Sequence, residues 1–335
     1  MSILIAVKGW SPEEWVDAVK SVAPGRAVEA AGAVTDPDAV QYALVWGPER
    51  GALARYPNLR AIFSLGAGVD HLTSDPELPD VPVARIVDPD LTMRMTEWVV
   101  LQVLLHHRQH LAYARQQAAR QWKSLRQAAA SEVRVGVMGL GVLGRDAAEA
   151  LKRLGFQVAG WSRSARDIPG LTTFHGEGGL EAFLAGTDIL VVLLPLTDDT
   201  RGILDGRLID SLAKDGPLGG PVLINAGRGK LQVEADIDAA LRDGRLKGAT
   251  LDVFSTEPLP AESPLWSAPN LVITPHVAAD SDPIAVSRNV VRQIEAPGRG
   301  EPLEGLVDRS RGDWPTRSAV QLGGNLGGRG TWRPW

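Results

Sequence analysis

Residues 133–154 read V-R-V-G-V-M-G-L-G-V-L-G-R-D-A-A-E-A-L-K-R-L. The valine-rich start predicts a buried β-strand, and the end predicts a helix. Between them, Gly139, Gly141 and Gly144 form G-x-G-x-x-G in the order strand, glycine turn, helix, which a dinucleotide-binding βαβ unit requires. In such a unit the first glycine permits a tight turn, the second lets the backbone approach a pyrophosphate, and the third lets helix and strand pack closely. The predicted cofactor-binding residues of this turn are Gly139, Gly141, Val142, Leu143 and Gly144, because a helix N-terminus offers N–H groups to phosphates.

The end of the next predicted strand, residues 157–161, indicates which dinucleotide binds. Ser162, Arg163 and Ser164 follow it, and no acidic residue comes before Asp167. A site for NAD(H) usually has a carboxylate there to hold the ribose 2′-hydroxyl. A guanidinium with neighbouring hydroxyl donors suits a 2′-phosphate instead. We therefore predict that NADP(H) is preferred and that NAD(H) is possible; the alternative is that Arg163 is a solvated loop charge.

The apolar pattern predicts two series of alternating strands and helices. Strands of the first series are expected at 3–7, 42–46 and 61–64, and those of the second at 133–138, 157–161, 188–194, 221–225, 248–253 and 271–274. Six strands in this order fit a complete doubly wound parallel sheet. A helical stretch from 92 to about 122 is long enough to connect two domains, and 284–294 is predicted to be helical.

Composition excludes several classes of function. The 335 residues carry a net charge of -5 and no basic block, so nucleic acid is not an expected partner. No cysteine is present, which removes disulfides, thiolate metal sites and a cysteine nucleophile. No apolar run approaches the ~20 residues that span a bilayer, and the N-terminus lacks a signal sequence's basic region. We therefore expect no membrane partner and a cytoplasmic protein.

Three side chains suited to keto-acid chemistry follow predicted strands of the second series. Arg228, Glu257 and His276 each come shortly after a strand ends. Open α/β sheets bind ligands beyond the carboxyl ends of their strands. Together the three could hold a carboxylate, polarise a carbonyl group and deliver a proton.

In several motifs the chain resembles the D-isomer specific 2-hydroxyacid dehydrogenase family, and most closely its branch that reduces glyoxylate and hydroxypyruvate. The shared stretches, besides the glycine motif, are L-G-A-G-V-D at 65–70, L-L-P-L-T at 193–197, N-A-G-R-G at 225–229, L-D-V-F at 251–254, E-P-L-P at 257–260, S-P-L-W at 263–266, T-P-H-V-A-A at 274–279 and V-D-R at 307–309. The likeness covers about residues 1–312.

The resemblance implies a role for each matching residue. Arg228 would bind the substrate's carboxylate and carbonyl oxygen, His276 would be the acid in reduction, and Glu257 would orient and charge the imidazole. The other implied substrate-binding residues are Trp46, Ala67, Gly68, Val69 and Trp266. The remaining implied cofactor-binding residues are Leu194, Pro195, Ala226, Gly227 and Asp252.

The resemblance also implies fold, activity and assembly. The expected fold is α/β, with two Rossmann-like domains built on parallel sheets and a deep cleft between them, as in formate/glycerate dehydrogenases. Residues 1–99 and 280–312 would form a discontinuous substrate-binding domain, 100–279 an NADP-binding domain, and 313–335 a disordered tail. The implied activity is NADPH-dependent reduction of glyoxylate and hydroxypyruvate to glycolate and D-glycerate by a homodimer. Alternatives are another D-2-hydroxyacid dehydrogenase, such as a D-lactate type, or a dinucleotide-sensing scaffold without turnover.

One further pattern points to a metal. His106 and His110 are four residues apart, which can place two imidazoles on one helix face. No glutamate stands in H-E-x-x-H form and no acidic third ligand is near. We therefore expect no metal site.

Overall fold

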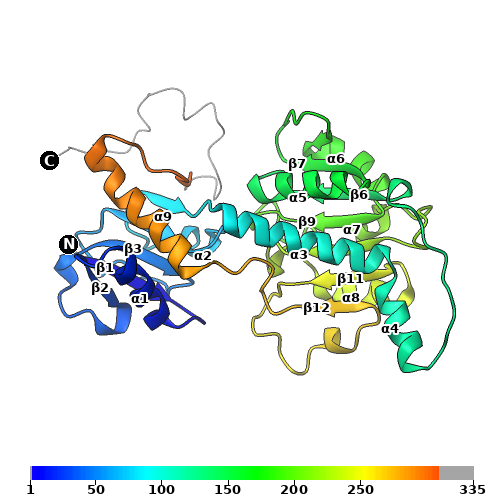
Figure 1. Cartoon of the computed structure of the whole chain (residues 1–335), viewed down its shortest axis with the longest axis horizontal. Coiled ribbons are helices and arrows are strands. Elements are labelled where there is room, and N and C mark those ends of the chain that lie inside the picture. Colours follow the sequence, from blue (N-terminus) through cyan, green and yellow to red (C-terminus); the bar gives the residue numbers. More distant parts are fainter. Residues whose placement is uncertain (1, 309–335) are drawn as a thin grey trace. The chain divides into compact units, whose positions relative to one another are not determined.

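The computed structural model describes residues 2–308, so the expected tail at 313–335 lies outside the described residues. The described chain forms two compact units (Figure 1). One holds the residues up to Leu91 and those from Ser281 on, and the other is Thr92–Asp280. The boundaries thus fall at 91/92 and 280/281, against 99/100 and 279/280 expected from the sequence.

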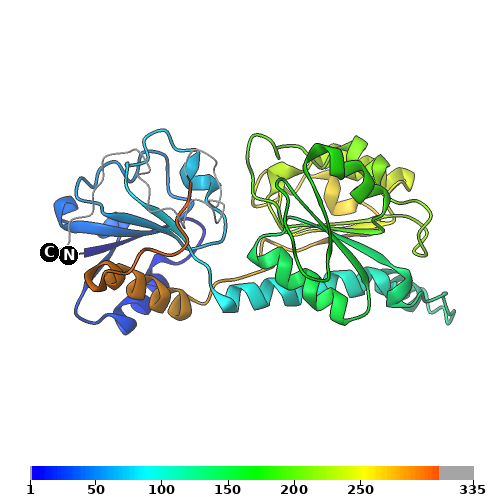
Figure 2. The ribbon, with the colours of Figure 1, turned by 90° about the horizontal axis from the view of Figure 1, so that it is seen from above.

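The first unit is built on a five-stranded parallel sheet in the order β2-β1-β3-β4-β5. Its strands are β1 (Ser2–Val7), β2 (Ala27–Ala30), β3 (Val40–Trp46), β4 (Ala61–Ser64) and β5 (Val83–Arg85), and its helices are α1 (Pro12–Val22), α2 (Asp70–Thr73) and α9 (Pro283–Glu295), with 3₁₀ turns at Ala31–Ala33, Pro37–Ala39 and Ala296–Arg299. Helices α1 and α9 cover one face of the sheet, and α2 lies on the other (Figure 2).

Local sequence explains why α1 and α9 form and pack. The Ser11 side chain caps α1 by accepting a hydrogen bond from the Glu14 amide, and Asp282 caps α9 in the same way. A proline follows each cap, where its missing N–H costs nothing. Trp15 of α1 and Val290 of α9 are buried in one apolar cluster with the sheet. The segment from Ser281 on therefore completes the core that the N-terminal segment begins.

The second unit is built on a seven-stranded parallel sheet in the order β12-β11-β10-β9-β6-β7-β8. Its strands are β6 (Arg134–Met138), β7 (Gln157–Ser162), β8 (Thr172–His175), β9 (Ile189–Val192), β10 (Val222–Asn225), β11 (Gly248–Leu251) and β12 (Leu271–Ile273). Its helices are α3 (Pro89–His107, which begins in the first unit), α4 (His110–Ala118), α5 (Val142–Arg153), α6 (Gly176–Ala185), α7 (Gly206–Ser211) and α8 (Glu234–Asp243), with 3₁₀ turns at Ala130–Glu132, Gly229–Leu231 and Pro264–Ser267.

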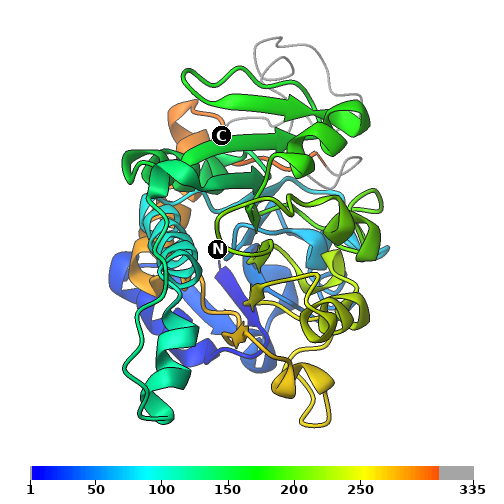
Figure 3. The ribbon, with the colours of Figure 1, turned by 90° about the vertical axis from the view of Figure 1, so that its right-hand side faces the viewer.

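Apolar side chains bury both faces of this sheet. Helices α3 and α5 cover one face, and α6, α7 and α8 cover the other (Figures 2 and 3). This arrangement needs strands that are apolar on both sides, which matches the unbroken apolar run of β9. Two parallel sheets flanked by helices confirm the expected α/β fold class. None of the described helices is long and apolar enough to cross a membrane.

The structure corrects two expectations about its elements. The second sheet has seven strands rather than six, because β8 was missed; β2 and β5 of the first sheet were missed too. The single helix expected from 92 to about 122 is two helices instead. The chain turns between them at Gln109, whose φ of 53° lies in the left-handed region. Helix α3 ends at His107 and α4 begins at His110, so His106 and His110 do not share one helix.

His106 lies against the sheet instead. Its Nε2 is 2.9 Å from the Thr250 hydroxyl. Its ring packs on Gly248, where a Cβ would be only 3.0 Å from His106 Nδ1. Burial penalises the charged imidazole and lowers the pKa of His106 to about 4. Histidine in the unfolded chain binds its proton near pH 6.5, so acid favours unfolding between these two values.

We expect the free energy of unfolding to fall by about 2–3 kcal/mol between pH 7 and pH 4 through His106 alone. Chemical denaturation of the protein and of His106→Gln across this range measures the slope. His106→Gln should lose the part of the slope that His106 contributes and keep the part from the neighbouring His107, whose pKa burial also lowers, while His110→Gln, which changes an exposed imidazole, should keep the full slope. Equal slopes in all three proteins would contradict the assignment.

Candidate active site

Strand order decides which loops of the second unit become neighbours. Strands β12, β11, β10, β9 and β6 are adjacent and parallel, so their carboxyl ends lie along one edge of the sheet. The chain leaving β12 carries His276, that leaving β11 carries Glu257, and that leaving β10 carries Arg228. The glycine motif leaves β6 at the same edge. The sheet therefore brings the three candidate catalytic residues to the same side as the predicted cofactor turn.

His276 and Glu257 form a direct pair. The distance from His276 Nδ1 to Glu257 Oε2 is 2.7 Å, and each side chain is about one-third exposed, at 35% and 36%. The other carboxylate oxygen, Oε1, accepts a hydrogen bond of 2.8 Å from the Phe254 amide. The carboxylate is thus anchored to its own loop and presents one oxygen to the imidazole. This fixes Nδ1 as the nitrogen that faces the carboxylate.

The charge of Glu257 is stabilised by its surroundings. Burial opposes ionisation, but hydrogen bonds from His276 and the Phe254 amide, together with the charges of His276 and Arg228, outweigh it and lower the pKa of Glu257. Because the pKa of Glu257 is lower in the folded chain than in the unfolded chain, its ionised form stabilises the fold at any pH above the usual pKa of a carboxyl group. This stabilisation is lost as the pH falls through the lowered pKa. Glu257 therefore stays ionised beside His276 at any pH near neutral.

Asp252 holds the loop that carries His276. It is 1% exposed, and its carboxylate accepts hydrogen bonds from the Thr274 hydroxyl at 2.5 Å and from the Val277 and Ala278 amides at 3.0 Å each. Its backbone carbonyl accepts from the His276 amide at 2.8 Å. His276 has a φ of 56°, a left-handed conformation that histidine adopts only occasionally. The position of Asp252 indicates that it sets this conformation; contact with a cofactor stays a prediction.

Arg228 stands in a tight turn at the end of β10. The turn is closed by Asn225, whose side-chain Oδ1 accepts from the Gly227 amide at 3.0 Å and whose Nδ2 donates to the Arg228 carbonyl at 3.2 Å. Arg228 Nη1 donates to the Gly227 carbonyl at 2.9 Å, and the residue is partly exposed. A planar guanidinium is the type of group that binds a carboxylate or carbonyl oxygen with paired hydrogen bonds.

The glycine motif forms the turn that the sequence predicted. Gly139 has a φ of 112°, and a Cβ there would come within 2.6 Å of the Leu193 carbonyl oxygen. A Cβ on Gly144 would meet the Gly139 carbonyl oxygen at 1.9 Å. Around Gly141 nothing lies within 4 Å of where a Cβ would be, and no side chain caps α5 at this residue. Open space in front of an uncapped helix N-terminus is what a pyrophosphate needs.

The other predicted cofactor residues adjoin this turn. Gly139 lies against Leu193 and the amide of Leu194, and a Cβ on Gly227 would come within 2.7 Å of the Leu194 carbonyl oxygen. Pro195 and Ala226 follow in the same two loops. The structure therefore brings together the residues that leave β6, β9 and β10.

The loop after β7 carries the predicted 2′-phosphate residues. The Gly139 amide donates to the Trp161 carbonyl at 2.9 Å, which ties the end of β7 to the glycine turn. Arg163 is half exposed and lies 3.9 Å from Asp199, a weak surface pair. The Ser162 hydroxyl donates to the Ser164 carbonyl at 2.8 Å, so Ser162 shapes the loop. Contact of Arg163 with a 2′-phosphate stays a prediction.

The first unit contains its own group of predicted residues. Trp46 ends β3, and its ring stacks on Trp10 with centroids 5.1 Å apart and 3° between the planes. A Cβ on Gly66 would come within 2.3 Å of the Trp46 ring, so only glycine leaves room for it. Ala67, Gly68 and Val69 follow in the loop after β4.

Sequence reasoning missed Ser64, which holds this loop. Its side chain is fully buried, and its hydroxyl lies 3.2 Å from the Gly66 carbonyl oxygen and 2.9 Å from that of Gly68. A hydroxyl at the end of an otherwise apolar strand was the available signal. Trp10 was missed as well, because its stack on Trp46 depends on the order of the strands.

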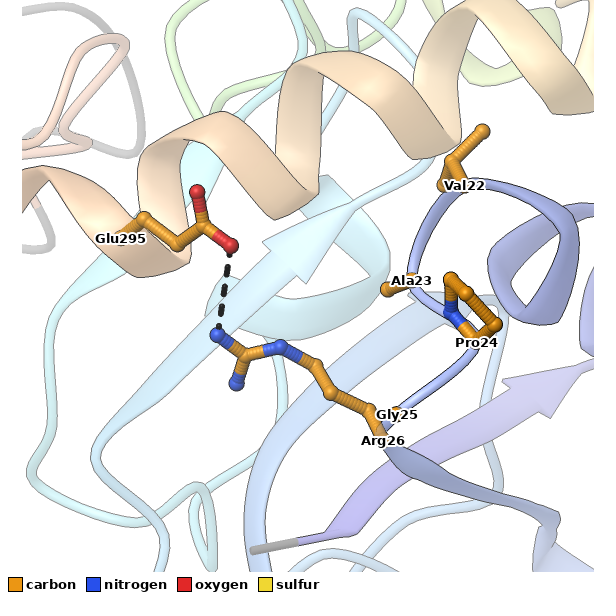
Figure 4. A pocket seen from close by; sticks show the side chains of 6 residues that line it. All are labelled: Val22, Ala23, Pro24, Gly25, Arg26 and Glu295. Carbon is orange, nitrogen blue, oxygen red and sulfur yellow. Dashed lines mark ion pairs between the residues drawn. The ribbon is translucent and has the colours of Figure 1, made fainter.

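Two other features remain, a tryptophan in the connection from β11 to β12 and a hollow in the first unit. Trp266, in the second unit, is 55% exposed and donates from its indole nitrogen to the Pro260 carbonyl at 2.9 Å. Figure 4 shows a hollow of the first unit where α1, β2 and α9 meet, crossed by an ion pair of 3.6 Å between Arg26 and Glu295. None of the predicted site residues lines it. Within residues 2–308, no cluster of three histidine or acidic side chains is placed to hold a metal ion.

Comparison with known proteins shows which family the chain belongs to. Residues 100–278 match the family described as D-isomer specific 2-hydroxyacid dehydrogenase, NAD binding domain. Glyoxylate/hydroxypyruvate reductase A from Salmonella newport (strain SL254) is 41% identical over 304 residues, which cover 89% of this chain and 95% of that protein.

Solved structures resemble the chain over nearly its whole length. An NADPH-dependent glyoxylate/hydroxypyruvate reductase from Sinorhizobium meliloti, in complex with NADP and sulfate, is 48% identical with a TM-score of 0.88, and covers 93% of this chain and 99% of its own. A D-isomer specific 2-hydroxyacid dehydrogenase from Xanthobacter autotrophicus Py2, in complex with NADPH and MES, is 41% identical with a TM-score of 0.87 and the same coverage. The chain therefore belongs to the D-isomer specific 2-hydroxyacid dehydrogenase family.

Proposed function

We propose that this protein reduces glyoxylate to glycolate and hydroxypyruvate to D-glycerate with NADPH. The observation that carries the proposal is the 2.7 Å pair of His276 and Glu257 beside Arg228, at the sheet edge that holds the glycine turn. The pair supplies a positioned proton donor, and Arg228 supplies a binding group for a carboxylate. The names of the Salmonella and Sinorhizobium relatives support the choice of substrates.

The residues divide the work of the reaction. NADPH would be held at Gly139, Gly141 and Gly144, and when bound it supplies the hydride. Arg228 binds the carboxylate and draws electron density toward the carbonyl oxygen. His276 donates the proton from Nε2 to that oxygen.

Glu257 fixes the orientation of the imidazole. Its carboxylate faces Nδ1 and holds the ring plane, so that Nε2 can be the donating nitrogen. On the acid side, the lowered pKa of Glu257 keeps the pair intact below the ordinary carboxyl range.

Cofactor preference rests on the loop after β7. Arg163, Ser162 and Ser164 occupy the positions where an NAD site usually has a carboxylate, and Arg163 is half exposed. A guanidinium favours the 2′-phosphate of NADPH over the 2′-hydroxyl of NADH. The NADP and NADPH complexes of the related structures support this preference.

A D-lactate-type dehydrogenase and a dinucleotide sensor without turnover are the competing functions. The sensor is disfavoured by the proton-donor pair, because binding a dinucleotide does not require one.

The product from hydroxypyruvate tests the D-specific reaction, and chiral chromatography should show D-glycerate alone. L-glycerate or a racemic product would contradict the proposed D-specific reaction.

Two glycine variants separate cofactor binding from folding. Gly141→Ala has room in the protein but places a methyl group before the helix N-terminus. We expect an unchanged melting temperature and a Kd for NADPH raised at least about tenfold, because the pyrophosphate loses close backbone approach. Gly144→Ala should lower the melting temperature, because its Cβ would overlap the Gly139 carbonyl. Fluorescence titration and calorimetry measure both; normal NADPH affinity in Gly141→Ala would move the phosphate site elsewhere.

The assembly and the remaining residue roles belong to the same proposal. We propose a cytoplasmic homodimer in which residues 100–279 bind the cofactor and residues 1–99 with 280–312 bind the substrate. The proposed substrate-contacting residues are Trp46, Ala67, Gly68, Val69 and Trp266.

The proposed dimer interface lies on the second unit. Leu101 and Trp122 are exposed there, and burying large apolar side chains in an interface would stabilise the dimer. Sedimentation equilibrium tests the dimer, and a monomer at micromolar concentration would exclude it.

A further inference from the structure

A buried amide pair connects the loop of Arg228 to the loop of Glu257. Asn225 is fully buried, and besides closing the Arg228 turn its Nδ2 donates a hydrogen bond of 2.8 Å to Gln232 Oε1. Gln232 is 4% exposed, and its Nε2 donates to the Val253 carbonyl at 2.9 Å. The bridge therefore runs from the chain leaving β10 to the chain leaving β11.

Each end of the bridge is connected to the loop of a proposed catalytic residue. At one end, Asn225 is bonded to the backbone of Gly227 and Arg228. At the other end, Val253 precedes Phe254, whose amide holds the Glu257 carboxylate. The two loops also touch, because a Cβ on Gly229 would come within 1.9 Å of the Phe254 backbone.

From this geometry we propose that Gln232 is a positioning residue that fixes the spacing between the Arg228 guanidinium and the Glu257–His276 pair. The inference rests on the proposed function, in which Arg228 holds the keto acid and His276 protonates it. A substrate carbonyl bound by both groups reacts only if both are in place, and errors of about 1 Å can cost about 100-fold in rate. The role needs a side chain that accepts at one end and donates at the other. Glutamine does both, whereas glutamate lacks the donor and methionine lacks both groups.

Gln293 offers a matched control. It is also buried, at 2% exposure, and also makes one donated and one accepted bond, to Asn289 Oδ1 at 2.8 Å and from the Glu304 amide at 3.2 Å. It lies on α9 of the first unit and bonds to none of the loops discussed above. Gln232→Met and Gln293→Met therefore make the same chemical change in similar surroundings.

The first test is kinetic. Both variants should melt at comparably lower temperatures and bind NADPH like the unmodified enzyme. Only Gln232→Met should show a higher KM for hydroxypyruvate and a lower kcat, with about a 100-fold loss of kcat/KM. Unchanged kcat and KM in Gln232→Met would overturn the proposal.

A second variant gives a pH readout that loss of stability alone does not produce. In Gln232→Glu, a protonated carboxyl group can donate to the Val253 carbonyl, whereas an ionised one repels it. Burial raises the pKa of such a carboxyl group. The ratio of its kcat/KM to that of the unmodified enzyme should therefore fall as pH rises, and a flat ratio would count against the bridge.

Crystal structures of the two methionine variants decide the question without turnover. The backbone of residues 226–229 should shift relative to β11 in Gln232→Met and stay in place in Gln293→Met. If residues 226–229 do not move in Gln232→Met, the proposal is wrong, even if that variant has lost activity. By contrast, failure of the unmodified enzyme to reduce any 2-keto acid would refute the proposed function, and the shift would still report whether Gln232 positions the loop.

Discussion

His276→Asn is expected to lower kcat for keto-acid reduction by about 10²–10⁴-fold, the usual contribution of a positioned general acid. Asparagine suits the position because it tolerates the left-handed backbone, here at φ 56°, better than most residues do. The substitution therefore removes the proton donor without forcing the loop to move. Asp252 should still hold the neighbouring amides.

Stopped-flow and steady-state assays with NADPH and hydroxypyruvate measure the loss. The Kd for NADPH and the melting temperature should stay close to those of the unmodified enzyme. His110→Asn, on the exposed surface of α4, is the control and should be fully active. Near-normal kcat in His276→Asn would mean that water or another group donates the proton, and the assignment of His276 would be wrong.

Arg228→Lys is expected to lower kcat/KM by about 10²–10³-fold, as removal of one electrostatic donor does in other enzymes. Lysine keeps the charge but offers a single ammonium group, and cannot match a carboxylate and a carbonyl oxygen with a planar fork. KM should rise and kcat should fall, because the Arg228 guanidinium holds the substrate both before and during hydride transfer.

The matched control for this prediction is Arg292→Lys. Arg292 binds Glu304 through two hydrogen bonds of 3.0 and 2.7 Å on the surface of the first unit. An exposed pair of this kind contributes little, so the control should change activity by less than about twofold. If both variants keep full activity, Arg228 does not bind the substrate.

The strands of the two sheet interiors could be predicted from sequence, and most of the edge strands could not. β9 is an uninterrupted apolar run and β10 is apolar up to its last residue, Asn225; both are buried on both faces, which is the pattern that parallel sheets require. The missed strands β2, β5 and β8 all lie at sheet edges. Thr172–His175 has no buried residue and Val83–Arg85 is three residues long, so neither carries enough apolar pattern to stand out.

The candidate site was predictable because strand ends are marked in the sequence. Arg228, Glu257 and His276 each follow an apolar run, and parallel strands bring such positions to one edge. The backbone of His276 was not predictable, since its left-handed φ depends on Asp252, which lies 24 positions earlier in the sequence. The role of Gln232 was hidden for the same reason: its partner is the carbonyl of Val253 on a neighbouring strand's loop.

The break at Gln109 shows a different limit. The segment from 92 to 122 contains neither glycine nor proline, so nothing in its composition marks an end. The chain leaves the helix through a left-handed glutamine, and Tyr113 then accepts hydrogen bonds from Leu125 and Gln127. Tertiary contacts outweigh local helix propensity here.

The most direct test of the account is the oxidation of NADPH and NADH, followed by absorbance, with glyoxylate, hydroxypyruvate and pyruvate in parallel. We predict fast turnover of the first two acids with NADPH, slower turnover with NADH, and weak activity on pyruvate. A preference for NADH would overturn the role given to Arg163 and leave the His276–Glu257 pair standing. Preferred reduction of pyruvate would favour the D-lactate type, and no turnover with any pair would contradict the central claim that this family member is a glyoxylate and hydroxypyruvate reductase.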